Sequence, residues 1–254
     1  MKTIYTFGNG NAEGRADMRE LLGGKGANLA EMNLIGVPVP PGFTITCDVC
    51  KIYNEQGREA VVNLIKEDVI KSVHHIESLP GYKFNDPQNP QLVSVRSGAP
   101  VSMPGMMDTV LNLGINDEVA ETLAKKSGNE RFAWDSYRRF VQMYGDVVLG
   151  MKPQNKNDID PFEEIIEAVK TAKGVKFDTE LDVDDLKQLV KLFKKAVKEN
   201  TGKDFPTDAW DQLWGAIYAV FDSWNNERAI LYRQMNQIPE SYGTAVNVQA
   251  MVYG

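Results

Sequence analysis

The sequence predicts a mixed α/β protein into which a small helical subdomain is inserted. Short runs of alternating or β-branched residues lie near both ends of the chain, which is typical of strands. Residues 117–200 instead follow a helical period almost throughout and carry most of the alternating charge. We therefore assign residues 1–113 and 201–254 to an α/β part and residues 114–200 to the helical insert.

The composition is that of an ordinary globular protein, and it excludes several classes. Of the 254 residues, 43% are hydrophobic and 25% are charged, which leaves room for one large or two modest domains. A net charge of −7 argues against general nucleic-acid binding and against a basic membrane surface. No apolar run reaches the roughly 18 residues of a membrane span. The N-terminus lacks an apolar signal core, so we expect a cytoplasmic location.

A glycine-rich turn around Lys25 lies between a predicted strand, residues 1–7, and a predicted helix. Amides at a helix start, together with a lysine, suit a phosphate group. The turn is not a Walker A loop, because Arg19 stands where the first glycine belongs and Gly26 where Ser or Thr belongs. A turn that merely allows tight packing is an equally good interpretation. The glycines concerned are Gly23, Gly24 and Gly26.

The next predicted elements are a proline-rich connector (37–42), a strand (43–46), a helix that begins at Thr46 or Asp48 and continues through Tyr53, a second helix (59–78) and a turn-rich loop (80–90). Cys47 and Cys50 form a lone C-x-x-C pair with no histidine at metal-ligand spacing. We interpret them as two thiols on a first helical turn rather than as a zinc or redox site. His74 and His75 lie near a helix C-terminus, where cations are favoured, and we interpret them as surface residues.

Arg96 follows a β-branched run from Leu92 to Val95 and precedes a loop that contains glycines and prolines. The loop carries three methionines and ends in Asp108-Thr109. The arginine fork matches phosphate oxygens and loop N–H groups can point at them, so the stretch suits a polyanionic ligand. A surface loop whose methionines face the core explains the pattern equally well.

Helices are predicted in the rest of the chain at 130–149, at 162–173, after an Asp-rich first turn (Asp182, Asp184, Asp185), at 207–225 and at 226–236, with a polar break at 153–160. The tryptophans of the 207–225 helix are expected in the core. The last ten residues alternate and predict a half-buried strand. Because the chain stops directly after this strand, we expect it to be a fragment of a longer protein.

Five long motifs follow one another along the chain. They are Leu22-Gly-Gly-Lys-Gly-Ala-Asn-Leu-Ala-Glu-Met, Gly36-Val-Pro-Val-Pro-Pro-Gly-Phe, Ser94-Val-Arg-Ser-Gly-Ala-Pro-Val-Ser-Met-Pro-Gly-Met-Met-Asp-Thr-Val-Leu-Asn-Leu-Gly, Phe132-Ala-Trp-Asp-Ser-Tyr-Arg-Arg-Phe and Gly243-Thr-Ala-Val-Asn-Val-Gln-Ala-Met-Val. Together they resemble the N-terminal nucleotide-binding domain of the pyruvate, phosphate dikinase family. The alternatives are the nucleotide domain of phosphoenolpyruvate synthase (pyruvate, water dikinase), which shares the first two motifs, and a non-catalytic nucleotide-binding module.

The resemblance implies an ATP-grasp-like fold, of which this chain is the N-terminal half, and an ATP-dependent phosphotransferase. Whole enzymes of the family convert ATP, pyruvate and phosphate to AMP, phosphoenolpyruvate and pyrophosphate. The nucleotide domain passes a pyrophosphoryl group to a histidine on a swivelling central domain, and a phosphoryl group on that histidine later reaches pyruvate. The resemblance also implies a homodimer.

By the same resemblance, Lys25 and Arg96 are the catalytic cations that contact the triphosphate. Other ATP-binding positions are a mobile loop over the phosphates (Gly105, Met106, Met107, Asp108, Thr109) and a strand near the adenine (Gln249, Met251, Val252). ATP and Mg²⁺ are the implied cofactors, with the metal ligands expected beyond residue 254 and none in this chain. Neither histidine matches the phosphohistidine motif, and neither cysteine matches the family's barrel cysteine. We therefore expect the chain alone to be inactive.

Overall fold

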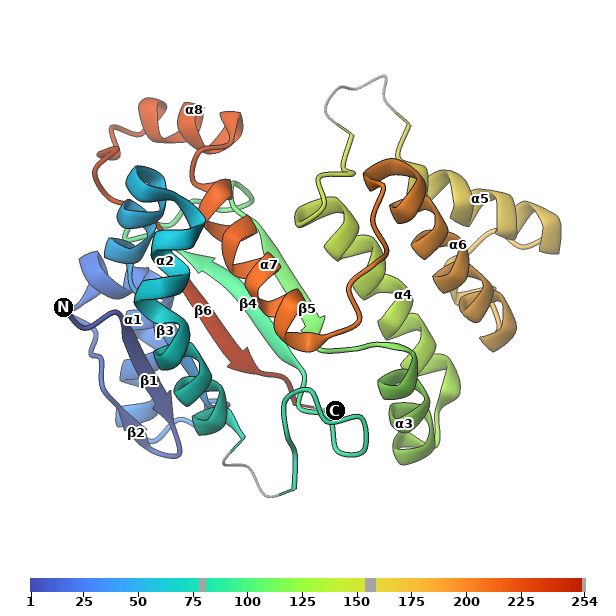
Figure 1. Ribbon diagram of the computed structural model, residues 1–254, viewed down its shortest axis with the longest axis horizontal. Coiled ribbons are helices and arrows are strands. Elements are labelled where there is room, and N and C mark those ends of the chain that lie inside the picture. Colours follow the sequence, from blue (N-terminus) through green and yellow to red (C-terminus); the bar gives the residue numbers. More distant parts are fainter. Residues whose placement is uncertain (78–80, 154–158, 253–254) are drawn as a thin grey trace.

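An antiparallel sheet forms the centre of the computed structural model, which describes residues 1–77, 81–153 and 159–252 (Figure 1). Its six strands within the described residues are β1 (Ile4–Gly8), β2 (Asn11–Ala12), β3 (Gly42–Ile45), β4 (Val93–Gly98), β5 (Thr109–Leu113) and β6 (Ala245–Ala250). The order across the sheet is β2-β1-β3-β6-β4-β5. The last strand in sequence therefore lies between strands from the first half of the chain, and all pairings are antiparallel.

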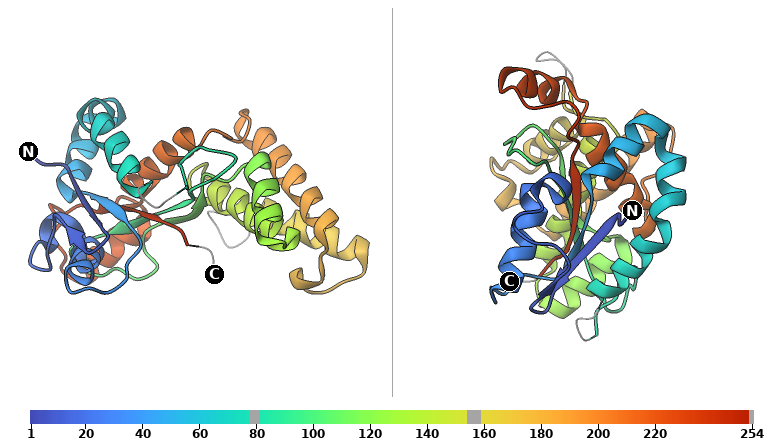
Figure 2. Two further views of the ribbon diagram at one scale, coloured as in Figure 1. Left: turned by 90° about the horizontal axis from the view of Figure 1, so that it is seen from below. Right: turned by 90° about the vertical axis from the view of Figure 1, so that its left-hand side faces the viewer.

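Helices cover both faces of the sheet and extend beyond one edge. They are α1 (Arg19–Leu34), α2 (Cys47–Ile76), α3 (Asp117–Ser127), α4 (Glu130–Val147), α5 (Pro161–Lys173), α6 (Val183–Thr201), α7 (Ala209–Ser223) and α8 (Glu227–Met235), with a 3₁₀ turn at Asp178–Glu180. Figure 2 shows α2 and α7 on one face and α1 on the other. The group from α3 to α6 lies beside the β5 edge, where α4 contacts that strand. The predicted α/β class is confirmed.

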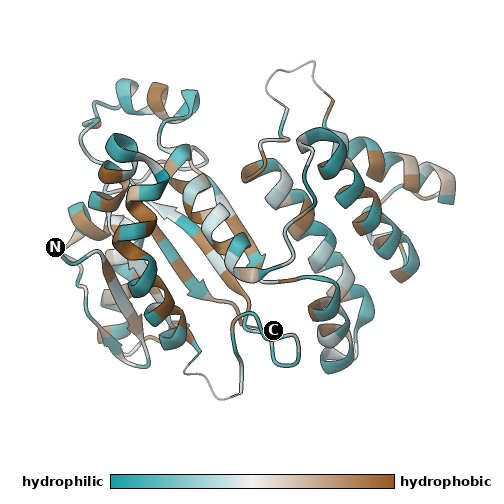
Figure 3. Ribbon diagram, viewed as in Figure 1, coloured by the Kyte–Doolittle hydropathy of each residue, from teal (hydrophilic) through white to brown (hydrophobic). Residues whose placement is uncertain are grey.

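Polar and apolar residues alternate along the strands, as the bands of colour in Figure 3 show, so the two faces of the sheet differ in polarity. Phe43, Val95 and Val248 are fully buried in the hydrophobic core. The opposite face carries a row of cross-strand partners that runs from Thr44 on β3 through Asn247 on β6 and Arg96 on β4 to Thr109 on β5. Because direct cross-strand partners lie on the same face, this register gathers polar side chains into one row.

The C-terminal strand is not half-buried, as the alternation predicted, but buried along its whole length. All six residues of β6 are buried, because the strand lies in the interior of the sheet with a helix layer on each side. Alternation indicates which residues share a face, but it does not reveal what covers that face. Met251 and Val252 lie after the strand, and Tyr253 lies outside the described residues.

Two further strand predictions need correction. Arg96 does not mark the end of its strand, because β4 continues through Gly98 and pairs there with Ala245. The segment Thr109–Leu113, which was not predicted as a strand, forms β5 at the sheet edge. The extension of β4 depends on pairing with β6 from the far end of the chain, and β5 forms by pairing with β4 across the intervening loop. Local sequence reveals neither set of backbone hydrogen bonds.

The helix predictions are largely confirmed, with differences at the ends. The two helices predicted before and after residue 57 form one element, α2, with a kink at Gly57. Cys47 and Cys50 are buried on its first turn, and burial raises the pKa of the Cys47 thiol to about 12, which suits a structural role. His74 is exposed as predicted, whereas His75 is only partly exposed. The predicted helix end at 78, the loop from Pro80 and the polar break at 153–160 include residues outside the described ranges.

One buried side chain of α7 contacts both segments that connect the α3–α6 group to the rest of the chain. Gln212 of α7 is fully buried, and its Oε1 accepts from the Gly114 N–H at 2.9 Å. Its Nε2 donates to the carbonyls of Ile115 and Pro206 at 3.2 and 2.8 Å. Both connections to the helices therefore converge on this amide. Of the α7 tryptophans, Trp210 and Trp214 are only partly buried, whereas Trp224 just beyond the helix is buried, so the core prediction holds fully for Trp224 alone.

A pH-dependent stability is expected from Asp146 near the end of α4. Its Oδ1 is buried without a hydrogen-bond partner among the described residues. Burial, then repulsion from Asp160 and Glu163, raises its pKa to about 7. An aspartate in the unfolded chain ionises near pH 4, so this group costs stability progressively between about pH 4 and 7, and the cost is complete above that window.

Asp146→Asn should therefore stabilise the chain at pH 8, by about 1–2 kcal/mol after allowance for solvent screening, and have little effect at pH 4. Thermal unfolding of both variants at the two pH values measures this difference. Equal stabilisation at both values would show that the charge on Asp146 is not the cause.

Candidate functional site

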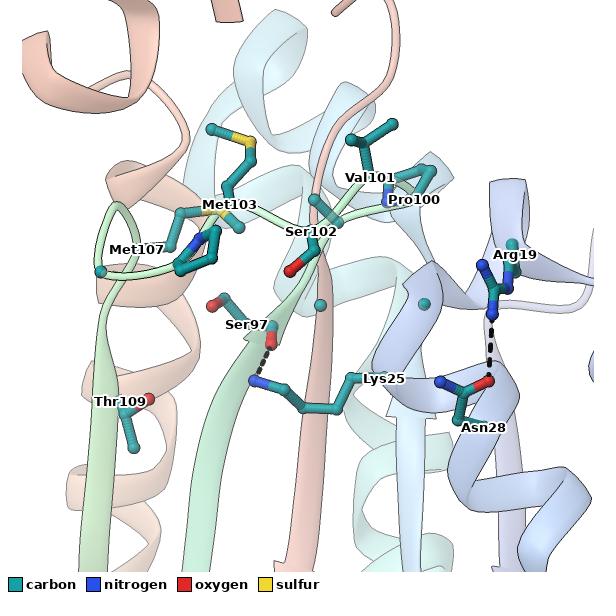
Figure 4. Close-up of a pocket in the computed structure, with 15 residues that line it drawn as sticks. Arg19, Lys25, Asn28, Ser97, Pro100, Val101, Ser102, Met103, Met107 and Thr109 are labelled. Carbon is teal, nitrogen blue, oxygen red and sulfur yellow. Dashed lines mark hydrogen bonds between the residues drawn. The ribbon is translucent and has the colours of Figure 1, made fainter. Parts of the chain in front are cut away.

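A cavity of about 560 Å³ lies where the end of β4 meets the beginning of α1 (Figure 4). Residues of the glycine-rich turn form one wall, and the loop between β4 and β5 forms the other. Among the described residues the lining consists of Arg19, Gly24, Lys25, Asn28, Ser97, Gly98, Ala99, Pro100, Val101, Ser102, Met103, Pro104, Gly105, Met107 and Thr109. The two segments that the sequence singled out for an anionic ligand thus meet in one cavity.

The glycine-rich turn is built for close contact with β4. Gly23 has φ +68°, and a Cβ atom there would lie 1.6 Å from the carbonyl oxygen of Gly98. The Gly24 N–H donates to the Ala99 carbonyl at 2.8 Å. Gly26 packs so closely on Thr44 and Asn247 that a Cβ would approach both within 3.0 Å. The turn therefore has the tight-packing role that was one of its two interpretations, and that packing also places Lys25.

Lys25 projects from the first turn after the Gly23 kink toward the end of β4, as Figure 4 shows. Its Nζ donates to the Ser97 carbonyl at 2.8 Å. Burial, and then the nearby charge of Arg96, lowers the pKa of Lys25. Two cations thus face the same region although they repel each other, which is a costly arrangement that an anion between them would relieve.

Arg96 lies partly buried in the polar row of the sheet. One guanidinium nitrogen, Nη2, donates to Oε1 of Gln249, whose Nε2 donates to the Pro40 carbonyl at 3.0 Å. The Nε of Arg96 is buried without a hydrogen-bond partner among the described residues. Burial lowers the pKa of Arg96, and among the described residues its hydrogen bond goes to a neutral oxygen. Its charge therefore remains available to a ligand.

The loop between β4 and β5 combines both roles that the sequence left open. Met103 is buried, and Met106 and Met107 pack partly against the core. Pro104 and Gly105 are exposed at the tip, where Gly105 has φ +72° and open space around it. The methionines thus hold the loop to the protein, and residues of the same loop, Met103 and Met107 among them, line the cavity.

The other predicted ATP-binding residues occupy three different places. Thr109 lines the cavity and is the cross-strand partner of Arg96. Asp108 instead lines a second cavity of about 540 Å³ with Trp214 and Tyr218, and burial raises its pKa. The side chain of Gln249 accepts a hydrogen bond from Arg96. Met251 and Val252 lie after the end of β6, and Val252 is 66% exposed. The structure therefore places Lys25, Gly105, Met107 and Thr109 at the cavity. Arg96 and Gln249 are not among its described lining residues, but they lie in the adjacent polar row, where Arg96 is paired with Thr109 across the strands. The remaining predicted residues, Met106, Asp108, Met251 and Val252, do not line the cavity.

Three polar residues near this region were not predicted. Asn247 is fully buried between Thr44 and Arg96, and its Nδ2 has no partner among the described residues. Its alternation with Gln249 was the signal that could have found it. Arg19 and Asn28 line the cavity and lie within 3.4 Å of each other. Helical spacing places Asn28 close to Lys25, so it too could have been predicted.

The chemistry available at this cavity is the binding of an anion. Lysine and arginine supply charge and hydrogen-bond donors, and no acidic residue lies among the described lining residues. Such a surface stabilises phosphate oxygens by charge-assisted hydrogen bonds. No helix in the described ranges has the length and apolar character needed to cross a membrane.

Comparison with known proteins identifies the family of the chain. The chain matches the family profile described as pyruvate phosphate dikinase, AMP/ATP-binding domain, over residues 19–78 and 61–254. It is 53% identical over 254 residues to pyruvate, phosphate dikinase of Clostridium symbiosum, covering all of this chain and 28% of that protein. The identity is also 53% with the Rhizobium meliloti (strain 1021) protein, of which 27% is covered, and with the chloroplastic protein of Mesembryanthemum crystallinum, of which 26% is covered. The chain thus spans about a quarter of the length of these curated relatives.

Proposed function

The chain belongs to the family of pyruvate phosphate dikinase AMP/ATP-binding domains, and from that premise we propose that it binds ATP with the triphosphate in the cavity between Lys25 and the β4–β5 loop. Within a whole dikinase, this binding would serve the conversion of ATP, pyruvate and phosphate to AMP, phosphoenolpyruvate and pyrophosphate. The phosphohistidine and the pyruvate site of that reaction would be supplied by other parts of the enzyme.

The observation that carries the proposal is the pairing of two partly buried cations with neutral partners. Lys25 donates to the Ser97 carbonyl and Arg96 to the Gln249 side chain. Buried cations are normally paired with carboxylates, because desolvation of a lone charge is costly. A site in which two cations have no carboxylate partner in the described part of the chain is prepared for an anionic ligand.

In phosphoryl transfer the protein mainly positions the phosphates and stabilises the developing charge. Lys25 and Arg96 would bind the phosphate oxygens, and the backbone of the β4–β5 loop would cover them and exclude water. Gln249 would orient Arg96, since its amide is itself fixed by the Pro40 carbonyl. Pyrophosphoryl transfer to a histidine would then take place on the open side of this surface.

Magnesium normally accompanies ATP, so the fit of the site to Mg²⁺ matters. The metal prefers several oxygen ligands, including carboxylates. The described residues that line the cavity include no carboxylate, and Asp108 lines the second cavity instead. The cavity therefore suits phosphate oxygens but does not provide a Mg²⁺ site, and we derive no step through the metal.

The domain division and the ATP-grasp-like fold belong to the same proposal. Residues 1–113 and 201–254 would form the nucleotide-binding part, with 114–200 as the inserted helical subdomain. The convergence of both connections on Gln212 supports boundaries near residues 114 and 206. The homodimer and the swivelling partner domain remain predictions that rest on family membership. The cytoplasmic location remains a prediction from the N-terminal sequence.

Calorimetry of this chain with ATP and with adenosine, both in the presence of Mg²⁺, tests the proposed function. We expect ATP to bind with a Kd weaker than micromolar, because the implied facing half of the cleft is not part of this chain. Adenosine should bind more weakly still, and added salt should weaken ATP binding, since the triphosphate contacts are electrostatic. Equal affinities for ATP and adenosine would contradict the proposed site, and micromolar ATP binding would contradict the need for a facing half.

A further inference from the structure

The β4–β5 loop is held on the side away from Lys25 by one side chain. The Nδ2 of Asn226, in the turn between α7 and α8, donates to the Met106 carbonyl at 3.0 Å. Met106 is followed by Met107, which lines the cavity. Asn226 thus contacts the backbone of the loop one residue from the proposed phosphate site.

The same side chain also begins helix α8. Its Oδ1 accepts from the Ala229 N–H at 2.7 Å, which is the N-cap interaction of that helix. The amide oxygen therefore bonds to the helix, and the amide nitrogen bonds to the loop. This double use fixes the orientation of the side chain, because reversing the amide would break both hydrogen bonds.

The remaining anchors of the loop lie elsewhere. Its first residues are held at the glycine-rich turn by the bond from Gly24 to Ala99, and Met103 is buried. In the part of the loop between Met103 and β5, the side-chain hydrogen bond to the backbone among the described residues is the one from Asn226. Figure 1 shows α8 at the end of the sheet where β4 ends and β5 begins.

We infer that Asn226 is a positioning residue that holds the Met106–Met107 segment over the cavity and thereby sets the affinity for the phosphates of ATP. The inference rests on the proposed function, and it adds the α7–α8 junction to the residues that shape the site. The arrangement links the loop to α8, so that displacement of that helix would release the cover of the cavity.

Asn226→Ser separates the two roles of the side chain. Serine is a comparable N-cap, so α8 should be retained and the melting temperature should change little. Its shorter side chain cannot reach the Met106 carbonyl. Loss of one hydrogen bond should make amide hydrogen exchange in residues 101–109 of the free chain about three- to tenfold faster, and should weaken ATP binding by a similar factor without affecting adenosine.

Asn116→Ser is the matched control. Asn116 caps α3 through its Oδ1, and its Nδ2 donates to the Thr207 carbonyl at 3.1 Å, so the substitution removes an equivalent bond far from the loop. Neither loop exchange nor ATP affinity should change. Unchanged loop exchange in Asn226→Ser would overturn the inference, and so would faster exchange with unchanged ATP affinity. If the unsubstituted chain binds no ATP, the proposed function fails, whereas the exchange rates still decide whether Asn226 holds the loop.

Discussion

Lys25→Ala in a full-length dikinase that carries this chain should lower the rate of the ATP-dependent partial reaction by about 10²- to 10³-fold. The substitution removes a charge-assisted donor from the cavity, and no other lysine lies among its described lining residues. Arg96→Ala should have an effect of similar size, because the two cations act on the same group of oxygens. The rate of pyrophosphoryl transfer from ATP, measured before pyruvate is added, reports this step separately from the later ones.

Lys195→Ala provides the control, since the Lys195 side chain on α6 is 70% exposed and pairs only loosely with Glu199. It should leave the partial reaction unchanged. Near-normal rates in both Lys25→Ala and Arg96→Ala would refute the assignment of the phosphate site. A loss in one variant alone would restrict the site to that cation.

Gly23→Ala should destabilise the chain by about 2–5 kcal/mol. Two effects add: alanine is strained at φ +68°, and its Cβ would lie 1.6 Å from the Gly98 carbonyl oxygen, a backbone atom that cannot move aside alone. The contact can be relieved only by separating the glycine-rich turn from β4. Urea unfolding of both proteins measures the loss.

Gly57→Ala is the control that separates backbone strain from the steric clash expected in Gly23→Ala. Gly57 at the α2 kink has φ +81°, but no atom lies within 4 Å of a Cβ built there. Its substitution should therefore cost only about 1–2 kcal/mol. Equal losses in the two variants would mean that the close contact between Gly23 and Gly98 does not matter. Gly23→Ala should additionally weaken ATP binding in the protein that remains folded, because Lys25 is two residues away.

Local pattern was sufficient for most of the helices. The apolar period located α4, α5, α6 and α7, and Asp182 capped α6 where the Asp-rich turn predicted it, by accepting from the N–H groups of Asp184 and Asp185. Pro161 begins α5, at a first helical position where proline is favoured. These features depend on neighbours in sequence, so they are visible without knowledge of the fold.

The sheet and the site depend on contacts between distant segments, and there the sequence was less informative. Ser97 and Gly98 have little intrinsic preference for a strand, yet β4 includes them because β6 pairs with them. The hydrogen bond between Arg96 and Gln249 joins residues 153 positions apart, so no local pattern could predict it. The resemblance supplied both residues as site positions, but only the register shows that Gln249 lies on Arg96.

The open choices about the two glycine-containing segments also required the fold. Tight packing and phosphate binding were alternatives for the turn at Lys25, and the structure shows that the packing of Gly23 and Gly26 is what directs the lysine into the cavity. In the β4–β5 loop, Met103 and Met107 both pack against the core and line the cavity. One physical arrangement thus serves both interpretations.

A structure of a full-length dikinase carrying this chain, bound to a non-hydrolysable ATP analogue, is the most direct test of the site. We predict phosphate oxygens within about 3 Å of Lys25 Nζ and of the Arg96 guanidinium, with residues 99–109 covering them. Lys25 would then exchange its bond to the Ser97 carbonyl for one to phosphate. The proposed site would be contradicted by a triphosphate bound elsewhere, for example in the cavity beside Trp214 and Tyr218. In that case Lys25 would keep its hydrogen bond to the Ser97 carbonyl, and Arg96 its bond to Gln249.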